Sequence, residues 1–190
     1  MLSKSFKDAV FQIMQKISNE IPDAHIKFPV NAYIVGGAAV HFHTNSRVSN
    51  DVDSILSNAV KIPDDLVVPW IDKYGVVQQL SFDYTYNSSF GLMQEDYDKR
   101  AILIKTLDEK LNIYILNPLD LIISKIARFS DSDEDDIRIL IKIKDIDRDE
   151  LYNLASDAIK VGIGFPKSIA THLEWVMEIY DEIHGVSNNI

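Results

Sequence analysis

Residues 35–56, VGGAAVHFHTNSRVSNDVDSIL, decide the fold that this sequence predicts. The apolar run at residues 32–35 has the composition of a β-strand, and the pair Gly36-Gly37 follows it directly as a tight turn. The next residues suit a helix, and a second strand is expected at residues 51–56, which begin by alternating polar and apolar side chains. The window therefore predicts a strand, a glycine turn, a helix and a second strand.

Two carboxylates, Asp51 and Asp53, flank Val52 on the second of these strands. Because side chains alternate along a strand, both are expected on one face, with their Cα atoms roughly 6.5–7 Å apart. Like charges this close repel one another unless a cation lies between them, and Mg²⁺ prefers oxygen ligands and commonly bridges phosphates. The glycine pair lets backbone N–H groups approach an anion. Taken singly, the glycines could be only a tight turn, and the acids two solvated side chains on an edge strand.

Read together with the spacing Arg47-x-Ser49-x-Asp51-x-Asp53, the window resembles the DNA polymerase β-type nucleotidyltransferase superfamily. This form of the motif is similar to that of the minimal nucleotidyltransferases and of the type IV toxin (abortive-infection) branch. The resemblance implies an α/β, nucleotidyltransferase-like mixed sheet with flanking helices, in which the glycine turn holds a triphosphate. It further implies that Asp51 and Asp53 bind Mg²⁺ or Mn²⁺, and that a third acid on a later strand completes the site.

The candidate for the third acid is Asp83. Residues 80–86 alternate strictly between apolar and polar, which predicts a strand with Asp83 on its polar face. Its apolar neighbours Phe82 and Tyr84 match the short third motif of the family; the other interpretation is an exposed strand acid. Without a third acid near the pair, the resemblance would imply a catalytically degenerate member.

A second stretch, NPLDLIISKIARFSDSDEDDIRIL at residues 117–140, resembles a later segment of the toxin branch. The matching residues are Lys125, Arg128, Asp133, Asp136 and Ile137. A lysine on an otherwise apolar helix face is expected either to reach the triphosphate or to lay its stem over the core with its ammonium group in water. Asp136 is expected to face Lys125 and hold that ammonium group in place, with Arg128 in a supporting role.

Arg47 is expected either to hold a phosphate or to brace the second strand by pairing with a carboxylate, which would offset the repulsion between Asp51 and Asp53. Ser49 is expected to cap or stiffen the approach to that strand, and the resemblance places Arg47 and Ser49 with the glycines among the nucleotide-binding residues. His41 and His43 are two residues apart and do not share a helix face, which argues against a metal site there.

The chain is expected to divide into a mixed α/β part, residues 1–116, and a mostly helical part, residues 117–190. In the first part, apolar residues at helical spacing predict a helix over residues 6–21. Pro63 and the acids after it predict another helix, which Pro69 kinks and Gly75 ends. Two further strand-like runs, joined by the short segment 108–110, predict a hairpin.

The second part opens on a helix start. Asn117 is a typical N-cap, and Pro118 suits the first helical position. Acids at residues 131–136 predict the beginning of another helix. Two more helices are expected over residues 149–161 and 167–184.

Composition limits the function. The chain has 190 residues, 46% of them hydrophobic, and a formal charge of −10, which is typical of a globular protein with a buried core. It has no cysteine, which excludes disulfides, thiolate zinc sites and a cysteine nucleophile. Excess acid disfavours a broad footprint on nucleic acid. We recognise neither a membrane-spanning run nor a signal peptide, so a cytoplasmic protein with no membrane partner is expected.

The function expected from these features is metal-dependent transfer of a nucleoside monophosphate from an NTP to a hydroxyl acceptor. The acceptor could be an RNA end, a protein or a small molecule, and an RNA end would need only a narrow basic track. Four residues could line such a track: Lys99, Arg100, Lys105 and Lys110. The alternative is a catalytically degenerate protein that binds a nucleotide or a partner, for example an antitoxin-like partner in a toxin–antitoxin module.

Overall fold

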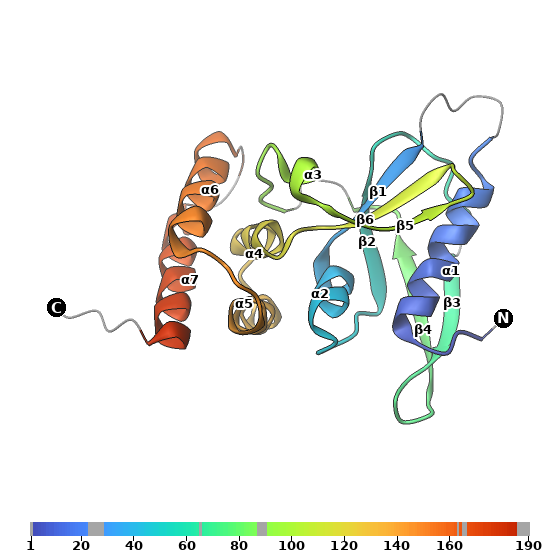
Figure 1. The fold of residues 1–190 in the computed structure, drawn as a ribbon, viewed down its shortest axis with the longest axis horizontal. Coiled ribbons are helices and arrows are strands. Elements are labelled where there is room, and N and C mark those ends of the chain that lie inside the picture. Colours follow the sequence, from blue (N-terminus) through green and yellow to red (C-terminus); the bar gives the residue numbers. More distant parts are fainter. Residues whose placement is uncertain are drawn as a thin grey trace. The chain divides into compact units, whose positions relative to one another are not determined.

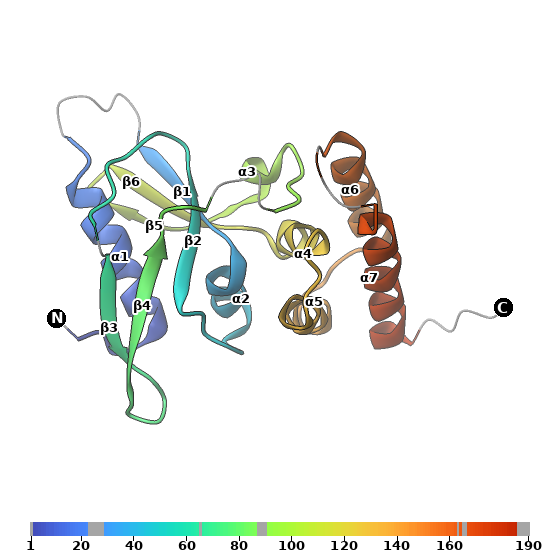
Figure 2. The same ribbon diagram turned by 180° about the vertical axis from the view of Figure 1, so that it is seen from behind.

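The computed structural model describes residues 2–22, 29–64, 66–86, 91–162, 164 and 167–185. The chain forms two compact units (Figures 1 and 2). The first unit combines Met1–Asn87 with Ala101–Leu116 and holds the β-sheet. The second unit combines Ser88–Arg100 with Asn117–Ile190, and its described elements are all helices.

The sheet of the first unit has six strands in the order β3-β4-β2-β1-β6-β5. The pairs β1–β6 and β2–β4 are parallel and the other neighbours are antiparallel, so the sheet is mixed. This confirms the α/β fold class and the mixed sheet that the sequence predicts. The strands are β1 (Val30–Ile34), β2 (Asp51–Leu56), β3 (Val67–Ile71), β4 (Val77–Asp83), β5 (Ile102–Leu107) and β6 (Leu111–Ile115).

Two helices, α1 (Phe6–Asn19) and α2 (Gly36–Thr44), pack on one face of this sheet. The helices contact each other through their rings: the ring centroids of Phe6 and His41 are 4.7 Å apart. Val52 of β2 and Leu80 of β4 lie on this covered face and are fully buried. Because side chains alternate along a strand, the residues next to Val52 on β2 point to the opposite face. That opposite face carries the acids.

The prediction of a helix between Pro63 and Gly75 was wrong, because the segment contains strand β3. Burial alternates along this strand: Val67 and Pro69 are exposed, whereas Val68 and Trp70 are buried. This period of two is typical of a strand, but the proline obscures it in the sequence. Within the six-stranded sheet β3 is the last strand. On its outer side Pro69 accepts a hydrogen bond of 3.0 Å from the Ser3 N–H, so the N–H that proline lacks is not needed for a ladder bond. Asp65, one of the acids read as a helix start, lies outside the described residues.

The strand expected at residues 80–86 lies three residues earlier, as β4. It starts directly after the hairpin turn at Gly75 and ends at Asp83, whose carboxylate binds the following turn. The hairpin between β5 and β6 is confirmed. The central turn residues Asp108 and Glu109 have φ values of 51° and 55°, the left-handed conformation that both central residues of a type I′ turn adopt, and the Lys110 N–H closes the turn on the Leu107 carbonyl at 2.9 Å.

The second unit consists of α3 (Tyr97–Arg100), α4 (Pro118–Ile126), α5 (Asp131–Ile143), α6 (Arg148–Val161) and α7 (Ile169–His184). The helical character of the C-terminal part is therefore confirmed, whereas α3 was not predicted. The expected N-cap at Asn117 is present, since its side chain accepts a hydrogen bond of 2.9 Å from the Leu119 N–H. Among the described residues, no helix is both long enough and apolar enough to cross a bilayer.

Candidate active site

The glycine turn joins β1 to α2. Gly36 is the first residue of the helix and has a φ of +58°, a left-handed conformation that L side chains rarely adopt. The N-cap residue, Val35, has an apolar side chain, so it offers no acceptor to the N–H groups of the first helical turn. A helix N-terminus with free N–H groups favours an anion, through both hydrogen bonding and the helix dipole.

Asp53 lies directly against this turn. A Cβ built on Gly36 would overlap one carboxylate oxygen of Asp53 and lie 3.2 Å from its Cγ. The backbone N–H of Val35 also donates to the Asp53 carbonyl at 3.0 Å, which fixes β2 beside the turn. The absent side chain at Gly36 is therefore what lets the carboxylate approach the backbone.

This contact leads to a prediction about stability. Gly36→Ala should destabilise the protein by more than the cost of left-handed backbone alone, which is about 1–2 kcal/mol, because the new Cβ also displaces Asp53. Gly75→Ala is the matched control, since Gly75 has a φ of +80° and a Cβ there would meet nothing within 4 Å. The free energy of unfolding in urea measures both variants. Equal losses in the two variants would contradict the close approach of Asp53.

Three candidate carboxylates belong to neighbouring parallel strands. Asp51 and Asp53 are on β2, and Asp53 is paired in register with Asp83 on β4. Register partners share a face of the sheet, and adjacent strands are about 4.8 Å apart. Asp51 is exposed, while Asp53 and Asp83 are half-buried. The topology thus brings the backbones of all three acids to one corner of the open face.

The carboxylate of Asp83 is engaged in its own turn. Its Oδ1 accepts hydrogen bonds from the backbone N–H of Thr85 at 2.8 Å and from the Thr85 hydroxyl at 2.6 Å. In the part of the chain that the structure describes, no three Asp, Glu, His or Cys side chains converge enough to hold a metal ion. The metal site of Asp51, Asp53 and Asp83 therefore stays a prediction. The two β2 carboxylates still fit Mg²⁺, which is usually held by one or two carboxylates together with waters and substrate phosphates.

Arg47 and Ser49 lie against the second glycine. A Cβ on Gly37 would lie 3.1 Å from Arg47 Nη2 and 3.1 Å from Ser49 Cβ. The Ser49 hydroxyl donates to the Asp51 carbonyl at 2.6 Å, so it stiffens the start of β2. The guanidinium group of Arg47 consequently adds positive charge at the N-terminus of α2, where an anion would bind.

His41 has a structural role that the sequence did not indicate. Its Nδ1 is 2.7 Å from the Arg47 carbonyl, which can only accept, so Nδ1 carries the proton. Burial lowers the pKa of His41 below its ordinary value, while the hydrogen bond to Arg47 opposes this and nearby Lys7 adds to the lowering. A neutral ring therefore anchors the loop that carries Arg47. His43 makes a similar contact, with its Nε2 2.7 Å from the Leu116 carbonyl.

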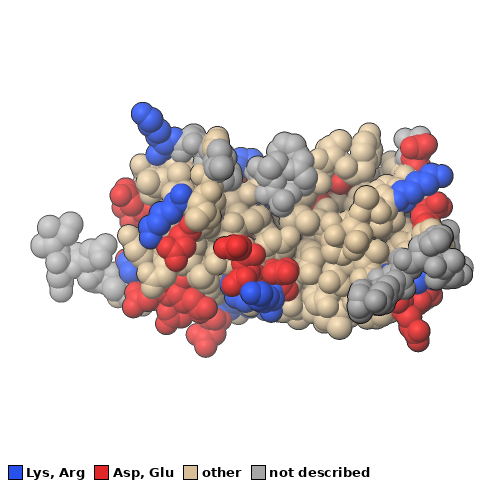
Figure 3. Space-filling view, turned by 90° about the horizontal axis from the view of Figure 1, so that it is seen from above, with Lys and Arg blue, Asp and Glu red and all other residues tan. Residues whose placement is uncertain are grey.

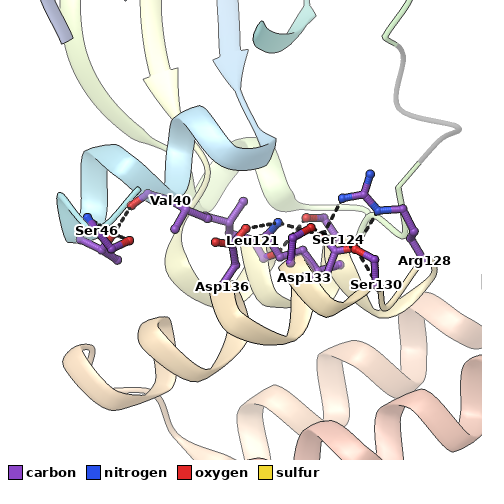
Figure 4. Close-up of polar contacts among 11 residues, drawn as sticks. Val40, Ser46, Leu121, Ser124, Arg128, Ser130, Asp133 and Asp136 are labelled. Atoms are coloured by element: carbon purple, nitrogen blue, oxygen red, sulfur yellow. Dashed lines mark hydrogen bonds and ion pairs between the residues drawn. The ribbon is translucent and has the colours of Figure 1, made fainter. Parts of the chain in front are cut away.

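The other candidate residues form a separate cluster in the helical unit. Lys125 on α4 is only 5% exposed, and its Nζ lies 3.1 Å from Asp133 Oδ1 and 2.8 Å from Asp136 Oδ2 on α5. The ion pair expected between Asp136 and Lys125 is present. Figure 4 shows Asp133, Asp136, Arg128 and Ser130 around these contacts.

Asp133 is the centre of this cluster. It accepts from Arg128 Nε at 2.6 Å, from Arg128 Nη2 at 2.7 Å and from the Ser130 hydroxyl at 2.8 Å (Figure 4). Burial acts to raise the pKa of Asp133, but Arg128, Lys125 and Ser130 outweigh it and hold the pKa far below its ordinary value. The capping box of α5, formed by Ser130 and Asp133, belongs to the same network.

These contacts support a positioning role for Lys125. Contact with a triphosphate would require its ammonium group to exchange at least one of two buried carboxylate partners. The direct role that the resemblance implies for Lys125 stays a prediction. So do the supporting roles of Arg128 and Asp136.

Comparison with known protein families shows which family the chain matches. A family model described as "Nucleotidyltransferase of unknown function (DUF6036)" matches residues 8–182, which is most of the chain and includes every candidate site residue. A search of curated proteins finds no match.

Proposed function

Because the chain belongs to this family of nucleotidyltransferases of unknown function (DUF6036), we propose that it transfers a nucleoside monophosphate from an NTP to a hydroxyl acceptor. One observation carries the proposal: the Asp53 carboxylate packs against the bare backbone of Gly36 at the N-terminus of α2. An anion-binding group and a cation-binding group are thereby placed at the same corner. A metal–triphosphate complex has the chemistry that satisfies both.

In this proposal the residues around Gly36 divide into a phosphate-binding set and a metal-binding set. The first-turn N–H groups of α2 and the Arg47 guanidinium bind phosphate oxygens. Asp51 and Asp53, with one oxygen of Asp83, would hold Mg²⁺ or Mn²⁺. When bound, the metal would supply charge neutralisation and alignment of the phosphates.

The transfer itself requires an acceptor hydroxyl in line with the leaving group. Its oxygen forms a bond to the α-phosphorus, the bond from that phosphorus to the β-phosphate oxygen breaks, and pyrophosphate leaves with the electron pair. We assign the hydroxyl proton to Asp83, since it stands on a separate strand beside Asp53. The turn at Thr85 would orient this carboxylate.

The charge of the protein limits which acceptors are plausible. All four residues expected to line a basic track have partners. Lys99 pairs with Asp96 at 2.8 Å and Arg100 with the buried Asp120, while Lys105 lies over the Phe11 ring and Lys110 donates to the Ile21 carbonyl at 3.3 Å. The formal charge of −10 also opposes a long nucleic-acid footprint. We therefore propose a short RNA end, a protein hydroxyl or a small molecule. The form of the motif further supports a place near the type IV toxin branch, with an antitoxin-like partner.

Label transfer tests the proposal. The protein is incubated with Mg²⁺ or Mn²⁺, total RNA, cell protein and each NTP carrying its label on either the α- or the γ-phosphate. We expect label from the α-phosphate alone to appear on one class of acceptor, and the same reaction with Asp51→Asn/Asp53→Asn to give none. Transfer of the γ-label would instead indicate phosphoryl transfer and would contradict the proposal.

The second candidate is a nucleotide-binding protein without transferase activity. The hydrogen bonds from Thr85 to Asp83 favour it, since they occupy one oxygen of the third acid. It predicts metal-dependent NTP binding, seen as a rise in melting temperature, with no label on any acceptor. The label experiment therefore separates the two candidates.

A further inference from the structure

The helical unit has an open groove that the proposed function does not use. Its volume is about 570 Å³, and residues of α5 and α7 make up most of its lining. The apolar part of the lining consists of Phe129, Trp175 and Ile179, and the charged part consists of Asp131, Glu134, Glu178, Glu182 and Arg138. The groove therefore combines an aromatic floor with an acidic rim.

The aromatic floor is packed against neighbouring rings and is still accessible to solvent. Trp175 is 46% exposed, which is high for a residue whose indole ring usually packs. Its ring lies 5.6 Å from the Phe129 ring and 5.5 Å from the His172 ring, and His172 is in turn anchored by a contact of 2.8 Å to the Ile126 carbonyl. These neighbours pack against the indole while much of it stays in solvent. Packed but exposed tryptophans are frequent anchors of protein interfaces.

The rim carries uncompensated negative charge. Its single cation, Arg138, binds Glu134 and Glu182 at 2.9 Å each. Asp131 and Glu178 have no ion pair or hydrogen bond through their side chains within the described ranges of the chain. Figure 3 shows Asp and Glu side chains also gathered on part of the surface of the helical unit. An anionic ligand, including RNA, would be repelled here.

From this complementarity we propose that the groove docks a basic segment of a partner protein, one that presents Lys or Arg beside an apolar side chain. The cation pairs with Glu178 and Asp131 and stacks over Trp175, which is the best aromatic partner for a cation. The apolar side chain packs on Phe129 and Ile179. The proposal does not depend on nucleotide transfer, because every lining residue lies in the helical unit.

A selection from displayed short random peptides tests it, with binders to Trp175→Ala removed by counter-selection. We expect the enriched peptides to combine Lys or Arg with an apolar residue, and to bind at least about tenfold more weakly to Trp175→Ala and to Glu178→Gln. Tyr152→Ala is the matched control, since Tyr152 is 49% exposed on α6 and does not line the groove. Its affinity for the peptides should not change.

Fluorescence places the binding at the groove. The chain has two tryptophans, and the other, Trp70, is 5% exposed. In the Trp70→Phe variant, Trp175 is the one remaining source of tryptophan fluorescence. Because Trp70 Nε1 has no hydrogen-bond partner among the described residues, the substitution removes no hydrogen bond of this side chain. Saturable change of Trp175 emission by the selected peptides supports the proposal. Enrichment of neutral or acidic peptides, equal binding to the groove variants, or no enrichment overturns it.

Discussion

The double substitution Asp51→Asn/Asp53→Asn should abolish metal-dependent NTP binding and lower nucleotide transfer at least about a thousandfold, equivalent to about 4 kcal/mol of transition-state stabilisation. The two carboxylates lie on one face of β2, and Asp53 touches the bare Gly36 backbone. Asparagine keeps the shape of each side chain but removes the charge that a divalent cation needs. Binding and transfer should therefore be lost together.

The melting temperature with and without Mg²⁺ and a non-hydrolysable NTP measures the binding half of this prediction. Glu20→Gln is a suitable control, because Glu20 is an exposed acid in the same unit beside Ile21, whose carbonyl accepts from Lys110 of the β5–β6 turn, on the other side of the sheet from β4. Without metal, the double variant should be at least as stable as the unmodified protein, since repulsion between two acids is relieved. If Mg²⁺ and NTP raise the melting temperature of the double variant as much as that of the unmodified protein, the binding site lies elsewhere. If the double variant is markedly less stable without metal, Asp51 and Asp53 have a structural role.

Lys125→Met should lower the free energy of unfolding by about 3–5 kcal/mol, the usual cost of breaking a buried ion pair by removing one partner. The Lys125 ammonium group lies between Asp133 and Asp136, and all three residues are at most 5% exposed. Without the ammonium group, Asp136 is left as a buried carboxylate that has lost the cation beside it. Urea denaturation gives the loss directly.

A double-mutant cycle tests whether the lost ion pair causes the destabilisation of Lys125→Met. Combining Lys125→Met with Asp136→Leu removes both charges, so the loss should be smaller than the sum of the two single losses. The exposed pair Lys160–Asp157 provides the control, because both side chains are more than half exposed and Asp157→Asn should cost under about 1 kcal/mol. If the losses of unfolding free energy in the cycle are additive, the ion pair is not the source of the stability that Lys125 contributes.

The same cluster sets a dependence on pH. Burial alone would raise the pKa of Asp133, but Arg128, Lys125 and Ser130 lower it far below the ordinary carboxyl value of about 3.9. A lowered pKa in the folded state means that the charged form contributes stability above the ordinary value and loses it as the pH falls further. The advantage of the unmodified protein over Asp133→Asn should hold from neutral pH to about 4 and shrink below it. An advantage independent of pH down to strong acid would contradict this.

The parts of the fold that depend on local chemistry could be predicted from the sequence. The turn at Gly36, the strand carrying Asp51 and Asp53, and the cap at Asn117 all follow from near neighbours in the chain. Strand β3 could not, because the proline at position 69 dominates the local pattern and only its place at the edge of the sheet makes it acceptable.

The candidate site shows the same limit. The spacing of Asp51 and Asp53 predicts their common face, but the hydrogen bonds from Thr85 that hold Asp83 depend on where β4 ends. The contact of His43 with the Leu116 carbonyl joins residues 73 positions apart, and no local pattern signals it. Lys125 was expected on a helix with an acid beside it, yet the second acid and the depth of its burial come from the packing of α4 on α5.

The position of β1 between β2 and β6 has a consequence for synthesis on the ribosome. The partner on one side of β1 follows within about two dozen residues, but β6, on the other side, is some eighty residues away along the chain. A nascent chain released before Leu111 would leave the backbone edge of Val30–Ile34 without its parallel neighbour. Such an edge readily pairs with other chains. Premature termination in this region should therefore yield aggregating fragments rather than a smaller functional protein.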